Sequence, residues 1–222
     1  MSQFVHRRKS GARKLVRAPT ETATEAIGVL ERGCRMFGLT KGQFSKIDLI
    51  RACLASTGPA HLVLSPGTTG IRDAENIAFL QKHGDLLSLR LLTDSSSPSR
   101  QPDYCRTVTE TFGVDAIRVC YIHAKFALLG NDEWKLCIRS SMNLNRNPRL
   151  EQFDIDDDAD LYDFILATVD DISQEMPAGL AQPNLTVQKT FEAILGGGFA
   201  TEAYRAEEDE GGWGKTKGIF ND

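Results

Sequence analysis

The chain has 222 residues, of which 41% are hydrophobic and 25% are charged, and its formal net charge is −4. These values are typical of a soluble globular protein with one well-packed domain, or one domain with tails. No apolar run approaches the ~18 residues of a membrane-spanning helix, and the basic N-terminus lacks the apolar core of a secretion signal. The five cysteines form no C-x-x-C pair and are odd in number, which favours reduced thiols. We therefore expect a cytoplasmic protein that does not act at a membrane.

Charge is distributed unevenly along the chain. Residues 1–17 carry Lys and Arg but no acidic residue, whereas residues 151–175 carry acidic residues but no Lys or Arg. The acidic net charge therefore hides a basic arm. We predict five segments: a basic flexible arm (1–20), an N-terminal helix and connector (21–42), the main domain (43–176), a C-terminal helical extension (177–205) and an acidic, Gly-rich flexible tail (206–222).

Apolar periodicity and turn residues predict strands and helices in alternation. Helices are expected over residues 22–36, 45–56, 73–82, 103–112, 158–173 and 187–195, strands over 61–65, 86–93 and 114–120, and a connector over 37–42. This alternation predicts an α/β fold, with a mixed β-sheet flanked by helices on both faces. The loops 66–70 and 94–102 each follow a strand, so they rim the site if those strands run parallel to its strand.

A β-hairpin is predicted after the third strand. Two apolar runs, residues 126–129 and 134–138, flank the turn signal Gly-Asn-Asp-Glu at residues 130–133. Folding the chain about residues 131 and 132 places His123 opposite Ser140 or Ser141, because paired positions in an antiparallel ladder keep a constant sum.

The polar residues at the open end of this hairpin are expected to share a face. Side chains alternate along a strand, so His123 and Lys125 point the same way, as do Ser141 and Asn143 while the chain stays extended. An imidazole, an ammonium, a hydroxyl and an amide therefore converge.

This combination of groups suits a phosphodiester substrate. Lys125 supplies a compact positive charge, and Ser141 and Asn143 donate hydrogen bonds to non-bridging oxygens. His123 either attacks phosphorus or moves protons as a general acid or base. Because fixed donors and cations take up the transition-state charge, we expect no metal and no cofactor.

The same residues carry a family resemblance. His-x-Lys on a strand, followed after a turn by Ser-x-Asn, resembles the signature of the phospholipase D-like superfamily. The resemblance implies the α/β architecture predicted above, with residues 43–176 as the catalytic domain. It also implies nuclease-like relatives that carry one copy of the motif and pair as homodimers. Gly130 stands where the family has an Asp that contributes to the structure of the site.

A downstream carboxylate is implied by the resemblance as well. In the family such a carboxylate orients the nucleophilic histidine. Glu151 is our candidate, with Asp154 as the alternate, to hold the far ring nitrogen of His123. A solvated loop acid is an equally good interpretation of Glu151.

The acidic run from Asp154 to Asp160 has a composition similar to that of a calcium loop. An EF-hand needs Gly at its sixth position and Glu at its twelfth, and these positions are Ala159 and Ile165. We interpret the run as the end of a strand and the start of a helix, where acidic residues favour the helix dipole.

Basic residues suggest a polyanionic partner. A basic arm binds the nucleic-acid backbone by counterion release, although a solubilising tail is an equal alternative. Three arginines near the proposed site strengthen the first interpretation. The candidate nucleic-acid-binding residues are Arg7, Arg8, Lys9, Arg13, Lys14, Arg139, Arg146 and Arg149.

The leading hypothesis is a phospholipase D-like phosphodiesterase that cleaves nucleic acid, DNA in preference to RNA, as a homodimer. A second histidine is needed to protonate the leaving group, and His6, His61 and His83 lack comparable neighbours, so a second chain would supply another His123. The alternative is an inactive phospholipase D-like protein that binds DNA or a protein partner, motivated by Gly130. A lipid-cleaving enzyme ranks third, because nothing amphipathic marks a membrane surface.

Overall fold

An eight-stranded mixed sheet forms the centre of the computed structural model. The structure describes residues 13–17, 22–66, 71–95, 97–100, 102–144 and 148–180. They belong to one compact unit, Met1–Pro183, and the second unit, Asn184–Asp222, lies outside the described residues. The expected helix over residues 187–195, the acidic tail and residues 1–12 of the basic arm therefore fall outside the description.

The strand order in the sheet is β1-β2-β8-β7-β6-β3-β4-β5. Strands β6 and β8 run antiparallel to their neighbours, and the other strands all run in one direction. The carboxyl ends of those parallel strands therefore lie at one edge of the sheet, which we call the carboxyl edge. The strands are β1 (Lys14–Arg17), β2 (Arg35–Thr40), β3 (Ala60–Ser65), β4 (Leu86–Asp94), β5 (Ile117–Cys120), β6 (Phe126–Gly130), β7 (Lys135–Ser140) and β8 (Glu151–Asp157).

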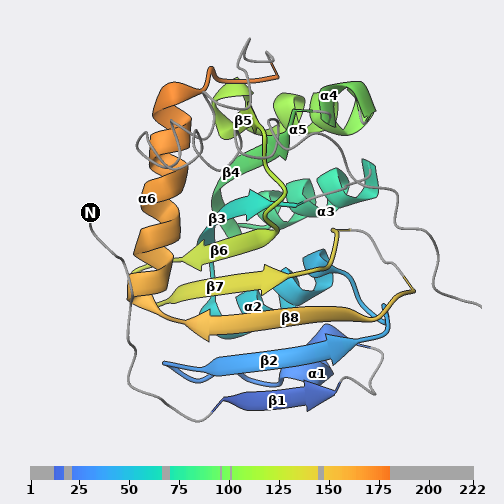
Figure 1. Ribbon diagram of the computed structural model, residues 1–222, viewed down its shortest axis with the longest axis vertical. Helices are drawn as coiled ribbons and strands as arrows, with labels where there is room; N and C mark the ends of the chain where they lie inside the picture. The colour runs from blue at the N-terminus through green and yellow to red at the C-terminus, as the bar shows by residue number, and fades with distance from the viewer. Residues whose placement is uncertain are drawn as a thin grey trace, which may run out of the picture. The chain divides into compact units, whose positions relative to one another are not determined.

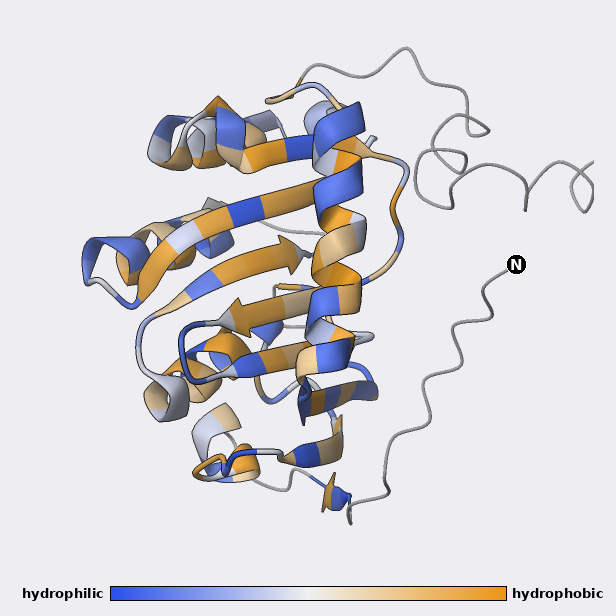
Figure 2. Ribbon diagram, turned by 90° about the vertical axis from the view of Figure 1, so that its left-hand side faces the viewer, coloured by the Kyte–Doolittle hydropathy of each residue, from blue (hydrophilic) through white to orange (hydrophobic). Residues whose placement is uncertain are grey.

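Helices cover both faces of the sheet, as the sequence predicts. Helix α6 lies on one face, and α1, α2, α3 and α5 lie on the other (Figures 1 and 2). No helix in the described part of the chain is long and apolar enough to cross a bilayer. The helices are α1 (Ala23–Ile27), α2 (Lys46–Thr57), α3 (Ile71–Lys82), α4 (Ser97–Arg100), α5 (Pro102–Phe112) and α6 (Ala159–Glu175), with a short 3-10 helix η1 (Val114–Ala116) before β5.

The central strands are apolar on both faces because each face carries a helix layer. In β3, Leu62 and Leu64 join the core beneath α1, α2, α3 and α5, whereas Val63 alternates to the other face. Figure 2 shows the hydrophobic colouring continuing along the central strands between the two helix layers. Four of the five cysteines are buried, none forms a disulfide, and Cys34 is half-buried.

The predicted helix over residues 22–36 is wrong beyond residue 27. Helix α1 ends at Gly28, which adopts φ 67°, and Gly33 adopts φ 72°, a left-handed conformation that favours glycine. The chain then enters β2, which takes the place of the last residues of the predicted helix and of most of the predicted connector 37–42. Buried Met36, Gly38 and Thr40 alternate with half-buried neighbours, which is the strand period.

One more strand lies where the sequence predicts none, and another lies where the sequence predicts only the end of a strand. Residues 14–17, expected in the flexible arm, form β1 parallel to β2. Residues 151–157 form the whole of β8, which joins β2 to β7. Asp158 then caps α6 by accepting a hydrogen bond from the Leu161 amide at 3.2 Å, so the acidic run ends a strand and begins a helix as predicted.

Candidate functional site

The site residues gather at the carboxyl edge of the sheet. Strands β3 and β7 end there, with Ser65 and Ser140, and the antiparallel β6 and β8 begin there. Strand β4 runs parallel to β3 and β7, so the loops after Ser65 and Asp94 both leave this edge, as the sequence predicts for loops that rim the site. Residues 121–125 connect β5 to β6 at the same edge.

Lys125 is held against the end of β7. The Ser140 amide donates to the Lys125 carbonyl at 3.2 Å, which extends the β6–β7 ladder by one residue. The Lys125 ammonium in turn donates to the Ser141 carbonyl at 3.1 Å. The cation and the Ser-x-Asn segment are therefore in contact, although the contact runs through the backbone of Ser141.

Ser141 is linked to the start of β8 by three hydrogen bonds. Its amide donates to the Gln152 carbonyl at 3.1 Å, and its hydroxyl accepts from the Gln152 amide at 3.0 Å. The same hydroxyl donates to the carboxylate of Glu151. The sequence predicts that Glu151 holds the ring of His123, whereas in the structure the hydrogen-bond partner of Glu151 is the Ser141 hydroxyl. The carboxylate therefore orients the hydroxyl of the site.

His123 lies outside the ladder. It is exposed, it belongs to the irregular segment before β6, and it has no hydrogen-bond or ion-pair partner among the described residues. The predicted register is wrong. Phe126 pairs with Arg139, so the same register extended would set His123 opposite Met142 rather than Ser140 or Ser141.

The shift comes from the turn between β6 and β7. The connection spans residues 131–134, two residues more than a turn centred on 131 and 132. The Asn131 side chain accepts hydrogen bonds from the amides of Glu133 at 3.0 Å and Trp134 at 2.8 Å. This Asx-type turn stabilises the longer connection.

The segment that carries His123 is tied to the sheet at one point. The Ser65 hydroxyl donates to the carbonyl of Ala124 at 2.6 Å. Ala124 is the residue between His123 and Lys125, so this hydrogen bond positions the backbone of the His-x-Lys segment over the end of β3. Asn143, half-buried, closes the other side, where its carbonyl accepts from the Lys46 amide at 3.3 Å.

Lys46 is a site residue that the motif does not reveal. It is the first residue of α2, its side chain is fully buried, and its ammonium lies 3.4 Å from the carbonyls of Ser65 and Pro66. Its pKa is lowered to about 7, mainly by burial and also by the positive charge of Lys125, whereas Glu151 opposes the shift. One signal in the sequence could have revealed it: a Lys stands directly after a strong N-cap Ser, at a helix N-terminus, where a cation is disfavoured.

Two of the candidate nucleic-acid-binding arginines are engaged by the acids of β8. Arg139 donates to Asp156 at 2.5 Å and lies 3.7 Å from Asp154, and Arg13 donates to Asp154 at 2.8 Å. Asp154, the alternate carboxylate for His123, is therefore part of this charge network. Arg149 is exposed.

Of the remaining candidate cations, the structure describes Lys14. Lys14 donates to the carbonyl of Ile27 at 2.9 Å. Arg7, Arg8, Lys9 and Arg146 lie outside the described residues.

Gly130 lies at the opposite edge of the sheet from the site. It ends β6, four residues after Phe126, which places it about 13 Å along the strand. A Cβ atom at this position would overlap the Tyr162 hydroxyl oxygen and would lie 2.7 Å from the Cζ atom of the same ring. The buried Tyr162 ring of α6 therefore occupies the space that a side chain at residue 130 would need.

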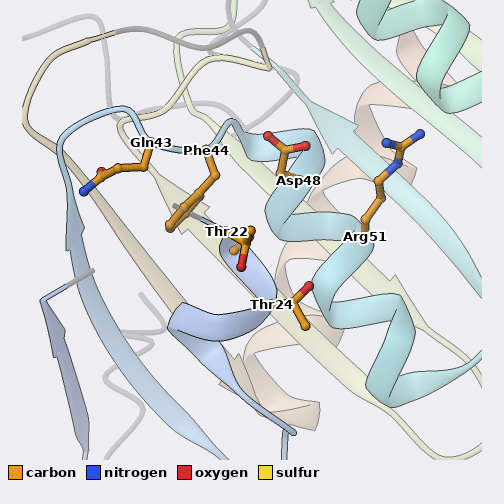
Figure 3. A pocket seen from close by; sticks show the side chains of 7 residues that line it. Thr22, Thr24, Gln43, Phe44, Asp48 and Arg51 are labelled. Carbon is orange, nitrogen blue, oxygen red and sulfur yellow. The ribbon is translucent and has the colours of Figure 1, made fainter. Parts of the chain in front are cut away.

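A pocket of about 450 Å³ lies beside the first turn of α2, outside the predicted site. Figure 3 shows Thr22 and Thr24 at helix α1, with Asp48 and Arg51 projecting from α2. Asp48 belongs to the capping box with Ser45, so this wall of the pocket is part of the helix N-terminus that presents Lys46.

Comparisons with known proteins found fold similarity only. No protein-family model and no curated protein matches the chain. Nuc, a phospholipase D family member from Salmonella typhimurium, aligns with a TM-score of 0.47 and 11% identity over 65% of this chain and 96% of its own. Polyphosphate kinase from Porphyromonas gingivalis aligns with a TM-score of 0.44 and 14% identity over 73% of this chain and 30% of its own. At these TM-scores and identities, neither similarity assigns a family or an activity to this chain.

Proposed function

We propose that the protein is a phosphodiesterase of the phospholipase D-like type that cleaves nucleic acid. The observation that carries the proposal is the hydrogen-bonded set at the carboxyl edge, in which Lys125 contacts Ser141 and Ser141 contacts Glu151. His123 lies two residues from Lys125 and is open to solvent. A nucleophile, a cation and an oriented hydroxyl thus lie on neighbouring segments, as phosphoryl transfer requires.

Each residue has a defined role in the proposed reaction. His123 attacks phosphorus, forming a P–N bond while the bond to the leaving alkoxide breaks, and a second imidazolium gives its proton to that alkoxide. Water then attacks the phosphohistidine, its proton passes to the second imidazole, and the P–N bond breaks. Lys125 and Ser141 stabilise the charge on the non-bridging oxygens, with Asn143 as a further donor.

The need for a second imidazole supports a homodimer. Among the described residues, His61 lies at the opposite end of β3 and contacts Ser88, and His83 stacks on Phe79 of α3. Neither lies at the carboxyl edge beside Lys125. A partner chain that docks over this edge would bring a second His123.

The departure at Gly130 does not remove a group from this site. Residue 130 lies at the far edge of the sheet, and Tyr162 fills the space beside it. The glycine therefore bears on packing between β6 and α6 rather than on the charge of the site.

Cleavage of single- and double-stranded DNA and RNA in excess EDTA tests the proposal. Wild type is expected to cleave at least one of these substrates, and His123→Ala is expected to lose cleavage while keeping its fold and its mass in light scattering. His61→Ala is the matched control, because it removes an exposed histidine from the opposite edge of the same sheet. Cleavage by His123→Ala at the wild-type rate would contradict the proposal.

A second candidate function is nucleic-acid or protein binding without turnover. The observation that favours it is His123, which has no orienting acceptor among the described residues. Catalytic histidines are normally held by a second group. Salt-dependent DNA binding by a folded protein that yields no products would favour this function over cleavage.

A further inference from the structure

Lys46 occupies a position where an apolar residue would be more stable. The Ser45–Asp48 capping box begins α2 directly before it, and its side chain is fully buried. Burial disfavours the ammonium, and so does the positive end of the helix dipole. Replacing a buried charge by a hydrophobic residue of similar volume is often neutral or stabilising. A cation at this position therefore points to a role other than stability.

The contacts of Lys46 reach both halves of the His-x-Lys and Ser-x-Asn set. Its ammonium lies 3.4 Å from the carbonyls of Ser65 and Pro66 at the end of β3, and the Ser65 hydroxyl binds Ala124. Its amide donates to the Asn143 carbonyl. One residue at a helix N-terminus thus joins the segment of Lys125 to the segment of Ser141.

Two charged side chains of the site act on the Lys46 ammonium. Lys125, from the segment before β6, disfavours its charge, and Glu151, from β8, favours it. On its own helix, Asp48 is engaged by the capping box. Residues 67–70, which follow Pro66 in the sequence, carry no titratable side chain.

Resting on the proposed function, we infer that Lys46 is a positioning residue that holds the His123–Lys125 segment against Asn143 and takes up a proton when an anionic phosphodiester binds beside Lys125. The negative charge of the bound diester favours the ammonium form of Lys46, just as Glu151 does. Linkage is reciprocal, so binding strengthens as the pH falls from 8 towards 7. The proton comes from the buffer.

The coupling is measured first without substrate. In protein carrying ¹³C-labelled lysine, the Lys46 Cε resonance is expected to titrate near pH 7. Its midpoint should rise in Lys125→Met, which removes the like charge, and fall in Glu151→Gln, which removes the opposite charge. A midpoint that responds to neither substitution overturns the inference, whatever the protein cleaves.

Proton uptake is measured next, with an oligothymidylate as the probe and His123→Ala as the protein. This background removes both cleavage and the imidazole. Calorimetry at pH 8 in Tris and in HEPES is expected to show uptake of up to one proton per site, absent in His123→Ala/Lys46→Met. If Lys46→Met leaves the proton uptake unchanged, the inference is overturned. If the oligonucleotide binds neither His123→Ala nor wild type, both the proposed function and the proton uptake are overturned.

Positioning is separated from charge by two substitutions in the wild-type background. Lys46→Gln keeps an N–H donor for the Ser65 and Pro66 carbonyls, and Lys46→Met keeps neither donor nor charge. Lys46→Met is expected to fold and to lose about 10- to 100-fold in kcat, as for other residues that orient a site, and its KM should exceed that of wild type more at pH 7 than at pH 9. Lys46→Gln is expected to retain more of kcat than Lys46→Met. Equal activity of Lys46→Met and wild type contradicts the positioning role.

Discussion

The charge of Lys46 couples the stability of the protein to pH. Its pKa in the folded protein is about 7, whereas an unfolded lysine titrates near 10.5. Between these values the unfolded chain binds more protons than the folded one, so stability rises with pH. This rise in stability is complete above pH 10.5, and it is lost as the pH falls to 7.

Lys46→Met should remove this pH dependence. The free energy of unfolding of wild type, measured relative to Lys46→Met in urea at pH 7, 8 and 9, is expected to rise by up to ~1.4 kcal/mol per pH unit. Burial raises the pKa of the Cys120 and Cys137 thiols to about 12, but both proteins contain these thiols, so their effect cancels in the difference. A difference that stays flat from pH 7 to 9 would show that Lys46 titrates as it does when unfolded.

Gly130 is a packing position, and enlarging it should destabilise the protein. Gly130→Ala places a Cβ against the Tyr162 hydroxyl and ring, so we expect a loss of roughly 1–3 kcal/mol in the free energy of unfolding. Gly130→Asp should lose more. Adding Tyr162→Phe removes the closest atom and should recover part of the loss, with Tyr162→Phe alone as the control. Gly130→Ala as stable as wild type would show that the ring moves aside freely.

At the scale of elements, one acid joins strands that lie far apart in the sequence. Asp156 of β8 is buried and accepts hydrogen bonds from Arg35 of β2 at 3.4 Å and Arg139 of β7 at 2.5 Å. Arg13, directly before β1, lies 3.6 Å away. This charge network therefore connects β1, β2 and β7 through β8.

Asp156→Asn should destabilise the sheet more than an equivalent surface change. Three arginines lose their shared acceptor charge, so a loss of roughly 1–3 kcal/mol in the free energy of unfolding is expected from urea titration. The control is Asp170→Asn, which breaks the exposed 2.7 Å ion pair with Arg90 and should cost about 0.5 kcal/mol or less. Equal effects of the two substitutions would mean that the network adds no stability.

Elements with strong local signals are predictable from the sequence. Ser45 and Asp48 form the capping box that begins α2, and Asp158 caps α6. The apolar runs of β3 and β6 identify buried strands, because both of their faces are covered.

The elements that were missed depend on partners that no local pattern reveals. In β2, buried Met36, Gly38 and Thr40 alternate with half-buried neighbours. The middle one of these buried residues is a glycine, and the ring of Phe153 in β8 covers it. Strand β8 contains the acids that pair with Arg13 and Arg139. Without its neighbour, β2 shows no strand signal, and the acidic run indicates only the end of β8.

The predicted site has the same division between local and distant information. Lys125 and Ser141 are brought together as neighbours across a turn, which their spacing indicates. The length of that turn depends on the Asn131 side chain, and two residues of difference change which residue the extended register sets opposite His123. Lys46 enters from a helix about 80 residues earlier, so no spacing within the motif could reveal it.

At the scale of the whole molecule, a shared site predicts how mixed dimers behave. Refolding wild type with an equal amount of His123→Ala yields wild-type dimers as about a quarter of the total. If each phosphate needs both His123 side chains, activity falls to about a quarter of that of the same total amount of wild type. If the site is complete within one chain, half of that wild-type activity remains. Mixing with His61→Ala instead is expected to leave activity unchanged.

Arg149 should contribute to nucleic-acid binding across the surface of the molecule. It is exposed in the segment before β8, close to Glu151 of the site. Arg149→Ala is expected to lower the slope of log Kd against log salt for DNA by about 1. Arg106→Ala is the control, because Arg106 lies on α5 and pairs with Asp103 of the same helix. Equal slopes for Arg149→Ala and Arg106→Ala would place the nucleic acid elsewhere.

The position of β8 in the sheet has a consequence for synthesis of the protein on the ribosome. Among the described strands, β1 and β2 join the rest of the sheet only through β8, whose residues 151–157 are made more than 100 residues after β2. Until then the nascent chain carries two unpaired edges, on β2 and on β7, and pairing over such distances is slow. Glu151 arrives with the same strand, so the chain acquires its complete candidate site in the step that closes its sheet.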